Sequence, residues 1–321
     1  MAFLVLNIIL SIFGFAILIK CADFFVDGAS SFAKNFRIPT VIIGLTIVAF
    51  GTSAPELAIS FSSHLSDNTD MLFGNVLGSN IANVFMILGV AVLIVPFKIE
   101  NDVIKKEIPI LLLITAGASV LFLDSLFLYA PYNGFCRADG VVMLLFFSIF
   151  IYYLISILRN KDIKDKSHEK PKHKLSMSIF LMLAGLGGII LGSNLVVDNL
   201  AAFAESIGIS QKIISVTIIS IGTSLPELVT TIVAAKKGEN SMAIGNIVGS
   251  NIFNIAIVLG LPVVVLGEAT TTAFGIIDIT FLLLSVVLLW IFTSSDRKLR
   301  RLEGAIFIAV YCIYVGYIFM Q

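Results

Sequence analysis

Charged side chains are scarce in this chain. They make up 13% of its 321 residues, whereas a soluble domain has roughly 25%. Hydrophobic residues reach 58% and the mean hydropathy is +1.03. Because so few charged groups cannot cover a water-facing surface, the composition excludes an ordinary soluble domain and predicts a protein integral to a lipid bilayer. The net charge of zero and the lack of a basic tail give no indication of a nucleic-acid partner.

Cysteine and histidine are also rare, with three of each. Cys21, Cys136 and Cys312 lie far apart in apolar surroundings, which argues against a disulfide framework or a metal motif. His168 and His173 fall in a polar segment with no carboxylates spaced to complete a metal shell, so a solvated linker is favoured over metal ligation. Neither a nucleophile–base pair nor a metal triad is recognisable, and we do not expect an enzyme.

Long apolar runs are abundant, and a helix of about 20 apolar residues spans a bilayer. We expect ten such helices, near residues 3–21, 39–63, 71–97, 108–128, 139–158, 175–198, 209–235, 241–266, 272–292 and 302–320. The first run lacks a basic segment before it and a cleavage site after it, so it is interpreted as a spanning helix rather than a signal peptide. The continuous runs do not alternate as the strands of a membrane barrel do.

The segment 159–174 is plainly aqueous and divides the runs into two sets of five. If loops alternate from an outside N-terminus, the inner loops hold 19 of the 21 lysines and arginines, leaving only Arg137 and Lys212 outside. Because basic loops stay in the cytoplasm, this predicts a multi-pass protein of the inner (plasma) membrane. Its linker would be cytoplasmic and both termini extracytoplasmic.

An internal repeat relates the two sets of helices. AFGTSAPELAISF at 49–61 matches SIGTSLPELVTTI at 220–232, and GNVLGSNIAN at 74–83 matches GNIVGSNIFN at 245–254. Both pairs share one offset along the chain, the repeat offset, which also places Asp27 over Asp198. Five helices, an odd number, separate the copies, so the halves have inverted topology. We therefore expect an all-α polytopic membrane protein with five-helix repeats at 1–158 and 175–321. The two aspartates would lie at opposite interfaces.

Glu56 and Glu227 are the most informative residues of the repeat. A charge inside an apolar helix costs at least roughly 2.5–3.5 kcal/mol, and the predicted spans near these glutamates contain no lysine or arginine to pair with them. Pro55 and Pro226 break the helix next to each glutamate and free backbone oxygens near Gly51 and Gly222. A bound cation explains these features better than a salt bridge or a simple kink.

Neutral oxygens surround the two carboxylates in sequence. Hydroxyls flank each break, at Thr52, Ser53, Thr223 and Ser224, while the GNxxGSN segments add Ser79 and Asn83, and Ser250 and Asn254, each pair four residues apart on one helical face. Gly74 and Gly78 form a GxxxG pattern that permits close helix contact. Carboxylates with neutral oxygens favour Ca²⁺, Na⁺ or Mg²⁺ over zinc and copper, and Mg²⁺ holds its water too firmly for an all-protein site.

These motifs carry a resemblance to a known family. GTSAPE and GTSLPE, each followed by GNxxGSN, resemble the α-repeats of the cation/calcium exchanger superfamily, in its sodium/calcium exchanger branch and prokaryotic members. The resemblance implies neighbouring ion sites at the membrane midplane. Glu56 and Glu227 would bridge Ca²⁺ and Na⁺, Thr52 and Thr223 would offer backbone oxygens, Ser53, Ser224, Ser79 and Ser250 would be outlying sodium ligands, and Asn83 and Asn254 would flank the centre. Several relatives carry aspartate at one of the last two positions, and potassium-dependent relatives carry it at that of Asn254.

The expected function is therefore an antiporter that exchanges Ca²⁺ for Na⁺ by alternating access, acting as a monomer without a cofactor. By resemblance, the first and sixth helices, 3–21 and 175–198, would slide across the core. A proton-coupled cation antiporter remains an alternative, in which the glutamates would titrate as the cation leaves. A passive cation channel is another, although an inverted repeat within one chain favours transport.

Overall fold

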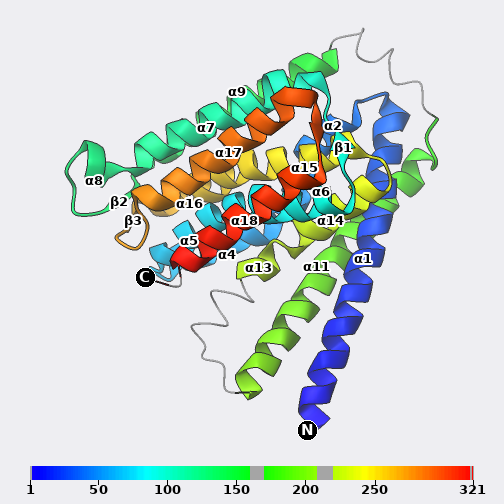
Figure 1. The fold of residues 1–321 in the computed structure, drawn as a ribbon, viewed down its shortest axis with the longest axis horizontal. Coiled ribbons are helices and arrows are strands. Elements are labelled where there is room, and N and C mark those ends of the chain that lie inside the picture. Colours follow the sequence, from blue (N-terminus) through cyan, green and yellow to red (C-terminus); the bar gives the residue numbers. More distant parts are fainter. Residues whose placement is uncertain (1, 160–169, 208–219, 319, 321) are drawn as a thin grey trace.

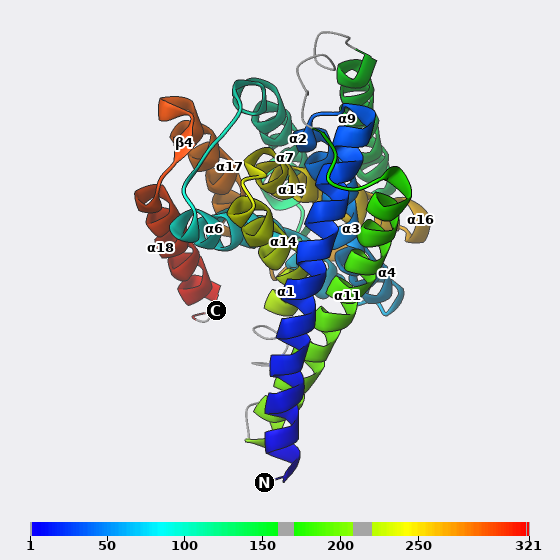
Figure 2. The ribbon, with the colours of Figure 1, turned by 90° about the vertical axis from the view of Figure 1, so that its right-hand side faces the viewer.

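Two long helices stand at one side of the molecule. The computed structural model describes residues 2–159, 170–207, 220–318 and 320. Helices α1 (Ala2–Phe36) and α11 (Leu175–Ser206) lie side by side in opposite directions and project beyond the other helices (Figures 1 and 2). Both exceed the predicted runs 3–21 and 175–198. In α1 the buried face continues through Phe25, Ala29 and Ala33, so helical packing outlasts the purely apolar stretch.

Glycines allow these two helices to touch along their length. A Cβ on Gly185 would lie 2.7 Å from the backbone nitrogen of Phe25, and one on Gly192 would lie 2.8 Å from that of Leu18. These distances are too short for any side chain at Gly185 or Gly192. The backbones of α1 and α11 therefore approach closely, and no side chain stands between them at these two positions.

The remaining helices of the first half begin with a broken segment. They are α2 (Thr40–Ile43), the π-helix η1 (Gly44–Val48), α3 (Ala49–Thr52), α4 (Ala54–Leu65), α5 (Thr69–Ala82), the π-helix η2 (Asn83–Leu88), α6 (Gly89–Ile94), the π-helix η3 (Val103–Glu107), α7 (Ile108–Phe122), α8 (Asp124–Phe127) and α9 (Arg137–Arg159). The run predicted near 71–97 is one span, Thr69–Ile94, in which the backbone ladder widens to π geometry in the middle.

The second half repeats these boundaries. It contains α13 (Ser220–Thr223), α14 (Leu225–Lys236), α15 (Asn240–Phe253), the π-helix η5 (Asn254–Leu259), α16 (Gly260–Leu266), α17 (Ile276–Asp296) and α18 (Arg301–Ile318). The starts and ends of α3, α4, α5 and η2 recur at the repeat offset in α13, α14, α15 and η5. Residues 209–219 of the run predicted at 209–235 lie outside the described residues, as does most of the linker 159–174.

Four short strands tie the halves together at the helix ends. β1 (Phe97–Lys98) pairs antiparallel with β4 (Lys298–Leu299), and β2 (Asn133–Phe135) pairs antiparallel with β3 (Ala269–Thr271). Each pair joins the first half to the second, so the two halves cannot separate without breaking a backbone ladder.

Apart from the four short strands, the chain is an all-helical polytopic membrane protein. Among the described residues, seven helices are long and apolar enough to cross a membrane, and the pair Thr40–Thr52 and Ala54–Leu65, bent by 44°, makes an eighth. Two of the ten predicted spans, 108–128 and 209–235, are not among these eight. Within 108–128 the helix α7 has only 15 residues, and 209–235 includes residues outside the description.

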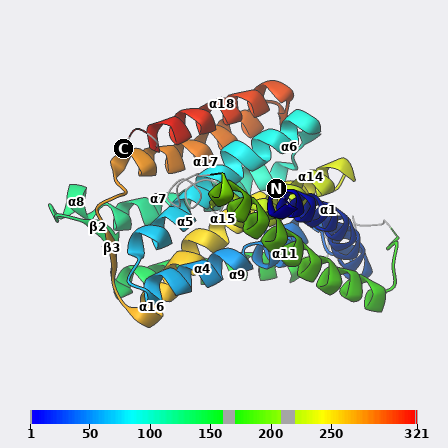
Figure 3. The same cartoon turned by 90° about the horizontal axis from the view of Figure 1, so that it is seen from below.

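Burial separates central from peripheral helices. In an apolar 18-residue stretch of each span, 72% of the residues of Thr69–Ile94 and 83% of those of Asn240–Leu266 are buried, compared with 17% in both Arg137–Arg159 and Arg301–Ile318. Figure 3 shows α17 and α18 on one side of α15, and α15 also contacts α2, η1, α3 and α14. The GNxxGSN segments therefore lie in the middle of the bundle, and the outer helices present apolar side chains such as Ile149 to their surroundings.

Candidate cation site

The two GTSxPE motifs form helix breaks. Ser53 (φ −88°, ψ 8°) separates α3 from α4, and Ser224 (φ −90°, ψ 4°) separates α13 from α14. Pro55 and Pro226 follow in the first helical turn, where the missing N–H has no partner to lose. The predicted break is confirmed.

The break changes the setting of the glutamates. Glu56 lies in the first turn of α4 and Glu227 in the first turn of α14, directly after the break that the two prolines predicted. The N-terminus of a helix carries partial positive charge. Each carboxylate therefore gains stabilisation from its own helix, which a mid-helix position would not provide.

Both glutamates are buried and poorly satisfied. Glu56 is 1% exposed and Glu227 is 0% exposed. Ser53 Oγ donates a 2.8 Å hydrogen bond to Glu227 Oε1, which joins the break of one half to the carboxylate of the other. Within the described chain, Glu227 Oε2 and both oxygens of Glu56 have no hydrogen-bond partner. Buried, unpartnered carboxylate oxygens are costly unless a cation occupies the space beside them.

Two asparagines add free oxygens to this centre. Asn83 and Asn254 each open a π-helix, η2 and η5, and are 1% and 0% exposed. Their amide nitrogens are engaged: Asn83 Nδ2 donates to Asn251 Oδ1 at 2.9 Å, and Asn254 Nδ2 donates to Ser79 Oγ at 3.1 Å. Their Oδ1 atoms have no partner in the described residues. Since η2 contacts α14 and η5 contacts α4, each asparagine lies against the helix that carries one glutamate.

The π-helices were not predicted. A π segment has a wider backbone ladder that is frequent at functional sites. Nothing in the local composition at 83–88 or 254–259 distinguishes it from an α-helix, so hydropathy gave no signal.

Matching hydrogen bonds frame both glutamates. Asn75 Nδ2 donates to Ser60 Oγ at 3.0 Å and to the carbonyl of Glu56 at 3.0 Å. Asn246, at the same position in the second half, donates to Thr231 Oγ1 at 2.9 Å. These contacts fix α4 against α5 and α14 against α15. Ser60 and Thr231 were not among the predicted residues, although each stands four positions after its glutamate, on the same helical face.

The remaining predicted residues lie around the two breaks. Thr52 Oγ1 donates to Ala49 O and Asn246 Oδ1, both at 3.3 Å, and Ser250 Oγ donates to Ala49 O at 3.4 Å. Ser224 is buried with its Oγ unpartnered in the described part, while Thr223 is half-buried. The structure thus brings the predicted residues to adjoining segments of α3–α5, α13–α15 and the two π-helices.

One backbone oxygen near the break is taken by another helix. Ser193 of α11 donates a 2.9 Å hydrogen bond to the carbonyl of Gly222. This carbonyl therefore already accepts one hydrogen bond from a side chain, which leaves its second lone pair for a cation. Ser193 could not be linked to Gly222 from the sequence because their contact depends on how α11 crosses α13.

Close backbone contact brings the two halves together at the site. A Cβ on Gly245 would lie 2.7 Å from Val41 O, and one on Gly249 would lie 2.6 Å from Leu45 O. The glycine pair of α15 therefore seats it on α2 and η1. At the repeat offset, the corresponding neighbours of Gly74 and Gly78 are residues 212 and 216, which lie outside the described residues.

Other acidic residues have different partners. Asp27 pairs with Lys172 and Lys237, each at 2.7 Å. Asp278 Oδ2 accepts a 2.9 Å hydrogen bond from Gly275 N and caps α17. In the described ranges, no group of three or more histidine, cysteine, aspartate or glutamate side chains is placed to hold a metal. The glutamate centre instead offers two carboxylates with neutral oxygens, a ligand set for hard cations.

Known proteins resemble the whole chain. The family model described as sodium/calcium exchanger protein matches residues 6–156 and 177–320. Inner membrane protein YrbG of Escherichia coli is 36% identical over 87% of this chain and 86% of its own length. Sodium/calcium exchanger MaX1 of Methanosarcina acetivorans is 33% identical over 98% of both chains.

A solved structure agrees with these sequence matches. The sodium-calcium exchanger NCX_Mj, soaked with 2.5 mM Na⁺ and 0.1 mM Ca²⁺, superposes with a TM-score of 0.82 at 30% identity, covering 97% of this chain and 98% of the other. The similarity extends through both halves and both GTSxPE segments. The chain therefore belongs to the sodium/calcium exchanger family.

Proposed function

We propose that this protein exchanges Ca²⁺ for Na⁺ across the membrane by alternating access. The observation that carries this proposal is the pair of buried carboxylates, Glu56 and Glu227, with three oxygens that have no hydrogen-bond partner in the described residues. Two negative charges match one Ca²⁺, and Na⁺ prefers the same oxygen ligands. Competition for one ligand set makes the two ions alternate rather than pass together.

We propose the ligand roles that the family resemblance implies for these residues. Glu56 and Glu227 would be shared by Ca²⁺ and Na⁺, and the free oxygens of Asn83 and Asn254 would face the same centre. Thr52 and Thr223 would contribute backbone oxygens. Ser53, Ser224, Ser79 and Ser250 would complete outlying sodium positions, for which Ser53 would release its hydrogen bond to Glu227.

The transport mechanism rests on an inverted repeat. We infer ten spanning helices, five in 1–158 and five in 175–321, with the linker 159–174 in the cytoplasm and both termini outside. The element boundaries that recur at the repeat offset and the strand pairs between halves support this arrangement. The glycine-lined contact between α1 and α11 would let this pair move along the core as one unit. The monomer in the plasma membrane would be the working unit.

The deciding experiment is uptake of radiolabelled Ca²⁺ into sodium-loaded proteoliposomes at fixed pH. An outward sodium gradient should drive uptake that collapses when Na⁺ is equal on both sides. Uptake that follows an imposed pH gradient and ignores sodium would establish the proton-coupled alternative. Calcium currents without coupling to either gradient would establish a channel.

A further inference from the structure

The amides next to the glutamates form a chain of hydrogen bonds with a fixed direction. Asn251 Nδ2 donates to the backbone carbonyl of Asn80 at 3.2 Å. A carbonyl oxygen only accepts, so this contact settles which end of the Asn251 amide is which. Asn251 Oδ1 therefore faces Asn83 and must accept its Nδ2, at 2.9 Å.

This direction decides what Asn83 presents to the site. With its nitrogen engaged, the Oδ1 atom is left buried and without a partner in the described chain. The opposite orientation would aim an NH₂ group, with its partial positive charge, at the cation. Asn254 also presents its Oδ1 atom, because its nitrogen donates to a different partner, Ser79 Oγ.

We propose that Asn251 is a positioning residue that holds the Asn83 oxygen toward the transported cation. The inference rests on the proposed function and assigns Asn251 no direct contact with the ion. Its counterpart in the first half, Asn80, does not share this role. Asn80 Nδ2 donates to Val76 O at 2.7 Å within its own helix, so its side chain orients no ligand.

The test compares Asn251→Leu with Asn80→Leu, a matched pair at equivalent positions. Asn251→Leu should raise the apparent KM for Ca²⁺ roughly tenfold, the effect of losing one buried hydrogen bond beside a charge. Asn80→Leu should change it by less than about twofold. Asn251→Ser, which is smaller and polar but too short to reach Asn83, should act in the same direction as Asn251→Leu and covers a failure of the leucine variant to fold.

A double-mutant cycle separates positioning from packing. An aspartate at position 83 presents an oxygen to the cation in either orientation of its carboxylate, so it does not need Asn251 to orient it. In the Asn83→Asp background, Asn251→Leu should therefore leave the KM for Ca²⁺ unchanged or lower it. An equal loss in both backgrounds, or equal effects of Asn251→Leu and Asn80→Leu, would overturn the proposal. If wild-type protein showed no sodium-driven uptake, the proposed exchange itself would fail instead.

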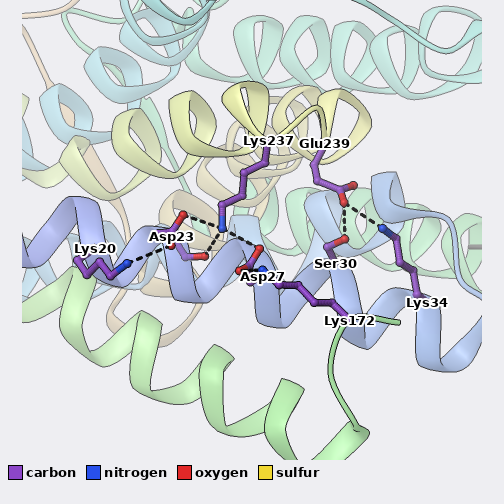
Figure 4. A network of polar contacts seen from close by, with 8 residues as sticks. All are labelled: Lys20, Asp23, Asp27, Ser30, Lys34, Lys172, Lys237 and Glu239. Carbon is purple, nitrogen blue, oxygen red and sulfur yellow. Dashed lines mark hydrogen bonds and ion pairs between the residues drawn. The ribbon is translucent and has the colours of Figure 1, made fainter. Parts of the chain in front are cut away.

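A second, independent observation concerns the end of α1 opposite the N-terminus. Figure 4 shows Lys237, in the turn between α14 and α15, reaching α1. Its Nζ lies 2.7 Å from Asp23 Oδ1 and 2.7 Å from Asp27 Oδ1. Glu239, at the start of α15, accepts hydrogen bonds from Ser30 and from Lys34 of α1. We call the residues drawn in Figure 4 the inner ionic network.

The polar segment also joins this network. Lys172 Nζ lies 2.7 Å from Asp27 Oδ2, and this contact with the carboxylate raises the pKa of Lys172 above its usual range. A cavity of about 390 Å³ opens among the network residues. The pair between Lys237 and Asp27 is half-buried, with 24% exposure for the Lys237 side chain and 20% for that of Asp27, whereas the Lys172 side chain is 66% exposed.

Several of these charges have no counterpart in the first half of the repeat. At the repeat offset, the places of Lys237 and Glu239 are taken by Ser66 and Asn68, and that of Asp23 by Asn194. The ion pair between Lys237 and Asp23 therefore has no equivalent at those positions, which are neutral.

We infer that the inner ionic network is a conformational latch. It clamps α1 to the α14–α15 turn, at the far end of the helix whose first turn holds Glu227, and so favours the conformer whose inner end is closed. This inference also rests on the proposed alternating access. It predicts unequal apparent affinities for Ca²⁺ at the two faces of the membrane.

The test uses neighbouring lysines that change charge equally. Lys237→Met should shift the ratio of the inner to the outer apparent KM several-fold toward tighter inner binding, whereas Lys236→Met, at an exposed side chain, should leave it unchanged. Lys237→Arg should retain most of the wild-type ratio. Lys237 Nζ also donates a 2.8 Å hydrogen bond to the backbone carbonyl of Asp23, so in the Asp23→Asn, Asp27→Asn background Lys237→Met should add a smaller shift than it causes alone.

Oriented proteoliposomes give both KM values from one preparation. Equal ratios for Lys237→Met and Lys236→Met would overturn the latch while leaving the exchange function intact. Absence of sodium-driven uptake by the wild type would instead remove the proposed function on which the latch rests.

Discussion

At the scale of single residues, the glutamates supply the charge of the site. In the proposed site each would carry half of the negative charge that one Ca²⁺ neutralises, and three of their four oxygens have no hydrogen-bond partner in the described residues. Glu56→Gln and Glu227→Gln should each lower sodium-driven Ca²⁺ uptake at least a hundredfold, since removing one charge of a buried pair costs about 3 kcal/mol or more. Initial rates in proteoliposomes measure this directly.

Folding should survive both substitutions. An amide in place of an uncompensated carboxylate removes a charge that the membrane interior disfavours, so thermal stability without ions should be unchanged or higher. Robust uptake by either variant would show that the two carboxylates do not form the transport site.

Asn254→Asp tests the neutral centre. A third carboxylate near two others is pushed toward its neutral form by repulsion, so the variant should acquire a pH dependence or a changed ion preference that the wild type lacks. The measurement is the Ca²⁺ KM between about pH 6 and 9. Profiles that coincide at every pH would place position 254 away from the glutamates.

The sequence was sufficient for some of these residues and insufficient for others. Glu56 and Glu227 stand out because a carboxylate in an apolar run is expensive, and their repetition indicates a common purpose. The orientation of the Asn83 amide was not predictable, because it depends on a hydrogen bond to Asn251, which lies far along the chain in the other half. The capture of the Gly222 carbonyl by Ser193 was missed for the same reason.

At the scale of secondary-structure elements, the break between α3 and α4 gives the site its shape. A continuous helix would need a hydrogen bond from residue 55 to the carbonyl of residue 51, which Pro55 cannot donate, and α4 turns by 44° from the preceding helix. Pro55→Ala restores the donor and allows the break to close. We expect thermal stability to rise by about 1 kcal/mol, while the maximal uptake rate falls several-fold because Glu56 is moved from the centre.

Pro226→Ala is the matched change in the other half and should behave alike. Pro109, at the start of α7 away from the glutamates, offers a control, since Pro109→Ala should leave uptake near the wild-type rate. Full activity in both motif variants would show that the serines, and not the prolines, maintain the breaks.

Element boundaries show where hydropathy stops being informative. The apolar runs located the helices around the site, and proline with glycine located the break. The last part of α1, beyond the predicted run 3–21, was missed because it mixes buried Phe25, Ala29 and Ala33 with charged residues of the inner ionic network. The apolar residues of this part of α1 are buried and its charged residues are paired because α11 and the α14–α15 turn lie beside it. The positions of these two elements cannot be read from the sequence of α1.

At the scale of the whole molecule, orientation in the membrane follows from the distribution of basic residues. Nineteen of 21 lysines and arginines fall on one predicted side. A cysteine introduced at Ser167, in the linker and outside the described residues, should resist labelling by an impermeant reagent in intact cells and react after permeabilisation. Labelling of intact cells would invert the assigned topology, and the native cysteines should first be replaced because Cys136 and Cys312 are exposed.

The charge of the whole transport cycle can be derived from the same centre. With Asn83 and Asn254 neutral, the cavity holds two negative charges when Glu56 and Glu227 are ionised. One Ca²⁺ balances them, whereas a loading of more than two Na⁺ leaves surplus positive charge, so the calcium and sodium half-cycles differ in the charge they carry. A membrane potential should therefore bias exchange by roughly 2.3 kcal/mol per charge per 100 mV.

Since no third carboxylate stands at Asn254 to hold an additional monovalent ion, exchange should proceed equally with and without potassium. Sodium-driven Ca²⁺ uptake should be measured at potentials clamped by an ionophore whose carried ion is not potassium, with potassium then added or omitted. Rates that ignore the potential, or that require potassium, would mean that the centre carries a different charge from the one assigned to its two glutamates.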